Sequence, residues 1–248
     1  MTRWLRHELR DLARRPLWAL ALAYVALALA GTPLARAFGL GAQARLGAEW
    51  VAGGGWLFVC GCALVLGLTA VRVQPMHLLF VARGAAPWRL TLVRWLAAAL
   101  ALLALCTTVA LTYLVAALAF RLPLDGSIAG WAVLLTAEGL VTLSLAALLR
   151  QLTGPLLAGA SALTLWWAGH LVQESAALAR SGTGGPAAVV AWLPDLDLLD
   201  GHTALVNAHP LPAEHVIIGL SASAGWICAL LCATLWLTTL RPPAETSA

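Results

Sequence analysis

The one acidic residue in the middle of a long apolar stretch is Glu138, about ten residues into the stretch Ile128–Leu149. Burying a carboxylate at the centre of a membrane helix costs at least about 2.5–3.5 kcal/mol, so we expect Glu138 to face a cavity or a partner side chain. A hydrogen-bonded structural residue is the favoured interpretation. The alternative is a residue that lines or gates a pathway.

A second group of polar residues lies at the outer end of the fifth apolar stretch and beyond it. His170 and Glu174 are four residues apart, so their side chains can meet on one face of a helix as an outer-face contact. The chain beyond them carries further metal-ligand types: Asp195, Asp197, Asp200, His202, His209 and His215. Their spacing matches no closed metal site. We expect solvated loop residues and no metal; metal or haem contact is the alternative.

Other chemistry is excluded by what the chain lacks. It contains no lysine, and a Walker A phosphate loop needs one to reach the β- and γ-phosphates, so segment 181–186 is only a glycine-rich turn. A serine protease needs a serine and its base buried together. Ser221 and Ser223 have no mid-span histidine to activate them. We therefore expect a protein that is not an enzyme by itself, without a cofactor of its own; ATP and Mg²⁺ would be bound by a separate ATPase subunit.

Six long apolar stretches must position these residues, and each has about the 17–25 residues that a helix needs to cross a bilayer. They are Leu17–Ala35, Val51–Val71, Trp95–Phe120, Ile128–Leu149, Leu156–Val172 and Val216–Thr239. With 61% hydrophobic and 10% charged residues, the chain has no room for a sizeable soluble domain. The sequence predicts an all-α membrane protein with a six-helix transmembrane domain over residues 17–241.

The arginines fall mainly on alternate connections, which predicts the orientation. Eleven of them lie on the side of the N-terminus: Arg3, Arg6, Arg10, Arg14, Arg15, Arg72, Arg83, Arg89, Arg94, Arg150 and Arg241. Only Arg36, Arg45, Arg121 and Arg180 lie on the other side. By the positive-inside rule both termini are cytoplasmic, including the tail 242–248, and the protein is a multi-pass protein of a bacterial inner membrane. The net charge of +4 is then a topology signal, and we expect no nucleic-acid partner.

Residues 1–16 are predicted to form a basic amphipathic helix on the membrane surface. Its apolar positions recur at helical spacing, with arginines on the remaining arc. Such a helix binds membrane lipid through its apolar face, and contact with a cytoplasmic partner is the functional alternative. The interfacial residues are Trp4, Leu5, Leu9 and Leu12.

The connection Arg72–Arg94 is predicted to contain a short helix over about residues 75–83, opened by Pro75. Pro87 then opens a second helix that continues into the third span, about 50 Å in all, and should project into the cytoplasm. A turn needs no such helix, so we interpret it as a contact for an ATPase subunit. The residues for that contact are Met76, His77, Leu79, Phe80, Arg83 and Gly84.

The remaining features concern packing. The outer connection 173–214 should contain short helices packed on the outer face, because part of it is too apolar to be free in solvent. We expect Cys60 and the other four cysteines to be small packing residues within spans. Most tryptophans near span ends should form an aromatic belt at the two membrane surfaces. They include Trp56, Trp95, Trp131 and Trp166.

Together these parts resemble the membrane subunit of an ABC-2 type (type V exporter-like) ABC transporter. The basic segment Leu5-Arg-His-Glu-Leu-Arg-Asp-Leu-Ala-Arg-Arg15 resembles that family's interfacial helix, and Arg72–Arg94 resembles its coupling helix. The segment Trp192-Leu-Pro-Asp-Leu-Asp-Leu-Leu-Asp200 resembles the region before its last span. The likeness covers essentially the whole chain but is architectural, and the coupling segment lacks the acidic residue that is common in the family.

The permeases of nitrous-oxide-reductase maturation and of gliding motility are the most similar in size, followed by the haem permeases of cytochrome c maturation. The resemblance implies a dimer of permease subunits, which we expect to be a homodimer, on two copies of an ABC ATPase subunit. It implies movement of a substrate across the membrane with ATP hydrolysed by that partner. The alternatives are a structural or scaffold subunit that transports nothing, and a permease that handles haem or metal.

Overall fold

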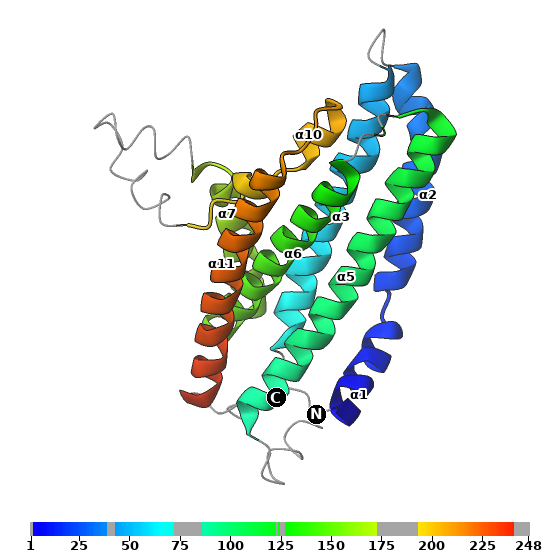
Figure 1. The fold of residues 1–248 in the computed structure, drawn as a ribbon. Helices are drawn as coiled ribbons and strands as arrows, with labels where there is room; N and C mark the ends of the chain where they lie inside the picture. Colours follow the sequence, from blue (N-terminus) through cyan, green and yellow to red (C-terminus); the bar gives the residue numbers. More distant parts are fainter. Residues whose placement is uncertain are drawn as a thin grey trace, which may run out of the picture.

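The structure is a computed structural model that describes residues 2–38, 43–71, 86–122, 124, 127–172 and 193–240. Within these ranges the chain is helical and contains no strand, so the prediction of an all-α protein is confirmed. The elements, shown in Figure 1, are α1 (Thr2–Ala13), α2 (Leu17–Ala37), α3 (Gln43–Ala70), α5 (Pro87–Phe120), α6 (Ser127–Leu152), α7 (Pro155–Gly169), the 3-10 turn η1 (Asp197–Leu199), α10 (His202–Val206) and α11 (Ala213–Leu240).

Five of these helices, α2, α3, α5, α6 and α11, are long and apolar enough to cross a membrane, so the chain is a multi-pass membrane protein. The predicted fifth stretch is different. Its helix α7 has 15 residues, fewer than the roughly 17 that a perpendicular crossing needs. Pro155 opens α7 at its first position, and Leu171 and Val172 lie beyond its end. The predicted count of six spans is therefore not established by helix length.

Helix α6 lies at the centre of the bundle and positions Glu138. It packs against α3, α5, α7 and α11. In the most apolar 18-residue segment of each helix, about 67% is buried inside the chain for α6, against 28% for α2 and 17% for α11. The two outer helices consequently present most of their apolar side chains outward, where lipid or another subunit can cover them.

The first and the last helix of the described chain, α1 and α11, both reach the same end of the bundle. Figure 1 shows α1 at the same end as the beginning of α5 and the last turn of α11. A hydrogen bond of 2.9 Å from Gln151 Nε2 to Thr238 Oγ1 also joins the end of α6 to the end of α11. The apolar face of α1 packs against the bundle itself: Leu12 is buried, and Leu5 and Leu9 are partly buried against the core. We call this end the α1 end.

Two predicted features of the connections can be compared with the structure. Pro87 opens α5 as expected, and its 34 residues correspond to about 51 Å of helix. The outer connection contains short helices, η1 and α10, as predicted; they pack on α3, α6 and α11 at the opposite end of the bundle. The predicted coupling helix 75–83, with Met76, His77, Leu79, Phe80, Arg83 and Gly84, lies outside the described residues, as does the tail 242–248.

Candidate functional site

Glu138 is buried in the middle of the bundle, with 1% of its surface exposed. Its Oε2 accepts a hydrogen bond of 2.8 Å from Trp56 Nε1. Its Oε1 accepts a hydrogen bond of 2.9 Å from Trp166 Nε1 and one of 3.5 Å from the Cys60 thiol. The same oxygen lies 3.1 Å from His170 Nε2. The carboxyl group is thus surrounded on both oxygens, and we call these five residues the Glu138 cluster.

Helical periodicity explains why these side chains converge. Trp56 and Cys60 are four residues apart on α3, and Trp166 and His170 are four residues apart on and just after α7. Residues at this spacing lie on the same helix face. Because α3 and α7 both pack on α6, each presents such a pair to Glu138 from its own side. Two separate i, i+4 pairs therefore build one site.

Aromatic contacts hold the donors in place. The rings of Trp56 and Trp166 have centroids 5.0 Å apart. The His170 ring meets both of them edge-on, at 5.4 Å from Trp56 and 5.1 Å from Trp166. Edge-to-face pairs at these distances are favourable beyond their buried area. The orientation of each N–H group toward Glu138 is therefore fixed by packing as well as by hydrogen bonding.

The charge balance of the Glu138 cluster is unusual. An indole N–H can only donate, so the two tryptophans define Glu138 as an acceptor on both oxygens. Within the described ranges, no arginine makes an ion pair with Glu138, and its one basic partner is His170. A buried carboxylate without a cation is costly. Among the described residues, His170 is therefore the only basic side chain in contact with this carboxyl group.

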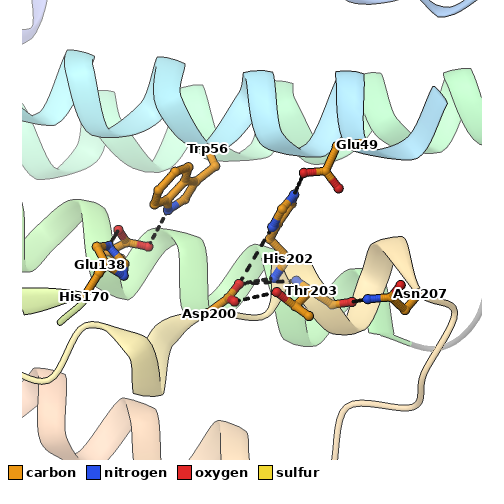
Figure 2. Close-up of polar contacts among 8 residues, drawn as sticks. All are labelled: Glu49, Trp56, Glu138, His170, Asp200, His202, Thr203 and Asn207. Atoms are coloured by element: carbon orange, nitrogen blue, oxygen red, sulfur yellow. Dashed lines mark hydrogen bonds and ion pairs between the residues drawn. The ribbon is translucent and has the colours of Figure 1, made fainter. Parts of the chain in front are cut away.

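A second polar group lies beside the first, on the side of the outer connection (Figure 2). His202 Nε2 lies 3.2 Å from Glu49 Oε1, and its ring is nearly parallel to that of Trp56, with centroids 6.5 Å apart. Asp200 holds the first turn of α10: its Oδ1 accepts from the backbone N–H groups of His202 and Thr203, and its Oδ2 from the Thr203 hydroxyl. Trp56 thus lies between two carboxylate–imidazole pairs, Glu138 with His170 and Glu49 with His202.

Backbone contacts fix the outer connection over this region. The N–H of Leu196 donates to the carbonyl oxygen of Gly169 at 3.1 Å, so the connection rests on the end of α7. A side chain at Gly169 would collide with Leu196, because its Cβ would lie 2.8 Å from Leu196 Cγ. A Cβ added at Gly53 of α3 would be in ordinary contact with His202 Nε2, at 3.4 Å, so the His202 ring packs on this part of α3. There its ring lies next to that of Trp56.

A cavity of about 290 Å³ opens between the two polar groups. It is lined by Trp56, Trp167, His170, Leu171, Asp200 and His202. Trp167 is 64% exposed and Leu171 is 41% exposed, so the cavity is accessible from the surface of the chain beside these two residues. The Glu138 cluster forms its inner wall through Trp56 and His170.

The α1 end holds a separate ionic contact. Arg94, near the beginning of α5, is 7% exposed, and its Nε lies 3.6 Å from Glu8 Oε2 of α1. Its Nη2 also donates to the carbonyl oxygen of Thr69 at 2.7 Å, in the last turn of α3. One guanidinium group therefore ties α1, α3 and α5 together. The distribution of arginines over alternate connections placed Arg94 among the topology-determining arginines and did not predict this role.

Several sequence predictions are refined by these contacts. Glu138 is hydrogen-bonded, as the favoured interpretation expected. His170 contacts Glu138 on α6; its proposed partner Glu174 lies outside the described residues. The aromatic belt was the wrong role for Trp166, which is buried and faces Glu138. Trp95 and Trp131 are buried as well, and Trp95 donates to Ser144 Oγ at 3.2 Å.

Cys60 is more than a packing residue because its thiol contacts Glu138. Trp56 likewise faces Glu138 from α3 and is not a simple belt residue. The i, i+4 spacings that bring these residues together are visible in the sequence, but nothing in it shows which helices are neighbours. Within the part of the chain that the structure describes, no three His, Cys, Asp or Glu side chains are arranged to hold a metal ion.

Comparison with known proteins adds no family assignment. No family model matches the sequence, and no curated protein matches it. The function must therefore be argued from the residues and their arrangement.

Proposed function

We propose that the protein is the membrane subunit of an ABC-2 type (type V exporter-like) ABC transporter, which moves a substrate across a bacterial inner membrane. In this proposal two copies form a homodimer, each with six spans and cytoplasmic termini, and two copies of an ABC ATPase subunit bind at the α1 end. The short helix α7 would complete the six spans where the bilayer is locally thin.

The observation that carries the proposal is the link between α1 and the bundle through Glu8 and Arg94. A helix that served only to anchor the chain on lipid would need its apolar face but no buried ion pair. Here a buried guanidinium joins α1 to the last turn of α3 and the first turns of α5. These are the two helices that flank the predicted coupling helix 75–83. A push on that segment or on α1 would reach the same arginine.

Segregation of arginines supports the orientation. In the described residues, the α1 end holds Arg3, Arg6 and Arg10 of α1, Arg14 and Arg15 just after it, Arg89 and Arg94 near the beginning of α5, and Arg150 near the end of α6. The opposite end holds Arg36 near the end of α2, Arg45 near the beginning of α3, and Arg121 just after α5. A cytoplasmic α1 end follows from the positive-inside rule. Single cysteines at Arg6, Arg45 and Asp197, in a variant without the five native cysteines, test it with a membrane-impermeant maleimide. Positions 45 and 197 should react from outside; reaction at position 6 would contradict the orientation.

The decisive experiment concerns the ATPase contact. The double substitution Met76→Asp and Phe80→Asp places two charges on the apolar face of the predicted coupling helix, so it should abolish substrate-linked stimulation of the ATPase. Insertion and dimerisation should be unaffected. Leu124→Asp, an exposed residue at the opposite end, is the control and should leave stimulation intact. A double variant that still purifies with a fully coupled ATPase would show that the segment is only a connector.

The alternatives give different outcomes in the same preparation. A scaffold subunit would purify with other membrane proteins but with no ABC ATPase. A permease that handles haem or metal would show haem absorbance or bound metal, and substitution of His170 would remove that signal. An ABC ATPase that purifies with the protein, with nucleotide turnover that depends on residues 75–83, favours the proposed function over both.

A further inference from the structure

The cavity beside the Glu138 cluster has the composition of a site for a small organic cation. We propose that it binds an ammonium group, quaternary or alkyl-substituted, of about the size of choline. This inference goes beyond the proposed function and does not depend on an ATPase, because every residue that it uses belongs to this chain.

The first argument is charge. Three carboxylates surround the cavity: Asp200 in its lining, Glu138 behind Trp56 and His170, and Glu49 behind His202. No arginine lies among the lining residues, and the chain has no lysine. The basic side chains in its lining are the imidazoles of His170 and His202, and the three carboxylates outnumber them, so the field in the cavity favours a cation.

The second argument is the nature of the walls. Trp56 and Trp167 line the cavity together with two imidazole rings. The faces of indole rings attract cations, and a cage of aromatic side chains is the usual binding site for quaternary ammonium groups. The hydrogen-bonding atoms of Glu138 and Asp200 are already occupied by protein donors. A ligand that needs charge and aromatic contact but few hydrogen bonds fits these walls best.

The third argument is size and access. The cavity of about 290 Å³ has room for about ten water molecules at about 30 Å³ each, which suits a cation of the size of choline. Two of its lining residues, Trp167 and Leu171, are exposed, so a ligand can reach the cavity from the surface of the chain. The cation could be free in solution or could be the headgroup of a lipid, since both present the same ammonium chemistry.

Isothermal titration of the purified protein with choline tests the proposal. A maltoside detergent is used because it carries no ammonium group. The matched probe is 3,3-dimethyl-1-butanol, which has the shape of choline without its charge. We expect saturable binding of choline and none of the alcohol. Short-chain phosphatidylcholine is the third probe: tighter binding than choline would indicate a lipid headgroup as the source, and weaker binding a free cation.

Variants locate the site. Trp167→Ala should weaken choline binding by about 5- to 30-fold, the factor expected for loss of one cation–π contact. Trp236→Ala removes an equally exposed tryptophan at the other end, 64% in both cases, and should change nothing. Asp200→Asn retains an N-terminal helix-capping side chain but loses the charge, and should also weaken binding.

Three results would overturn the inference. The first is binding of the alcohol as tight as that of choline, which would show an apolar hole without charge preference. The second is binding of choline by Trp167→Ala as tight as by the wild type, which would place the site elsewhere. The third is the absence of saturable binding of choline and of phosphatidylcholine by the folded wild-type protein. Circular dichroism of each variant distinguishes loss of the site from loss of the fold.

Discussion

Replacement of Glu138 tests whether the cluster around it stabilises the fold. Glu138→Ala removes the acceptor of two indole N–H groups, those of Trp56 and Trp166. A buried donor that is left without a partner costs about 1–3 kcal/mol, so two of them cost about 2–6 kcal/mol. Trp56 is only partly buried and can reach water more easily. We therefore expect the lower part of the range, a loss of about 2–4 kcal/mol in the free energy of unfolding.

Glu138→Gln should lower the free energy of unfolding less than Glu138→Ala does, because only one of the two indole contacts is lost. The Oε1 position accepts from Trp166, while the Oε2 position accepts only from Trp56. A glutamine that places its carbonyl oxygen at the first position keeps the Trp166 bond and turns its NH₂ group toward the Trp56 N–H. One unpaired donor then costs about 1–3 kcal/mol. The order of stability should be wild type, Gln variant, Ala variant.

Unfolding of the purified protein in mixed micelles with increasing SDS measures these differences. Thr142→Val is the matched control: Thr142 lies one turn further along α6, is buried, and its hydroxyl has no hydrogen-bond partner among the described residues. That substitution should be neutral or stabilising. Trp166→Phe should cost less in the Glu138→Ala background than in the wild type, because the donor is already orphaned there. Equal stability of Glu138→Ala and the wild type would refute the reasoning.

Two further predictions concern helix contacts. Glu8→Gln removes the charged partner of Arg94 and should detach α1 from the bundle, which would appear as accelerated amide exchange over residues 4–12. Asp11→Asn is the control, because it breaks only the half-exposed ion pair with Arg15 and should have little effect on exchange. Gly67→Ala should destabilise the fold by about 1–3 kcal/mol, because its Cβ would lie 2.4 Å from the carbonyl oxygen of Leu143. Gly61→Ala, on the same helix with open space around it, should be neutral or slightly stabilising. Unfolding in SDS measures both variants.

Hydrophobic length was sufficient to predict most of the helices. The stretches that became α2, α3, α5, α6 and α11 contain enough apolar residues to specify a helix wherever they lie in a bilayer. The prediction was weaker for Leu156–Val172, because hydropathy does not show where the helix ends. In the structure α7 ends at Gly169, whose carbonyl oxygen accepts from Leu196 of the outer connection. Only a tertiary contact reveals that boundary.

The candidate site was predicted only in part for the same physical reason. Glu138 could be singled out because a charge at mid-span is costly and needs compensation. Its partners could not, since a tryptophan near the end of a span has equally good reasons to lie at the membrane surface or to donate inward. The choice for Trp56 and Trp166 depends on α3 and α7 both packing on α6. Long-range helix pairing is not encoded in any local pattern of this sequence.

Helix α3 joins the two polar regions of the molecule. Trp56, which donates to Glu138, and Thr69, whose carbonyl oxygen accepts from Arg94, are 13 residues apart on it, or about 20 Å. Between them α3 and α6 approach closely at Gly67, where an added Cβ would lie 2.4 Å from the carbonyl oxygen of Leu143. A displacement of α1 or of the base of α5 should therefore reach Trp56 as a tilt of a stiff helix.

Gly67→Ala tests this connection as well as stability. An added methyl group forces α3 away from α6 near the α1 end, and a stiff α3 would transmit that shift to Trp56. Amide exchange around Trp56 should then accelerate, and choline binding in the adjacent cavity should weaken. Gly61→Ala lies closer to Trp56 but meets no neighbour, so it should cause neither change. If Gly67→Ala alters exchange only near residue 67, α3 bends between the two regions, and events at the α1 end do not reach the Glu138 cluster through this helix.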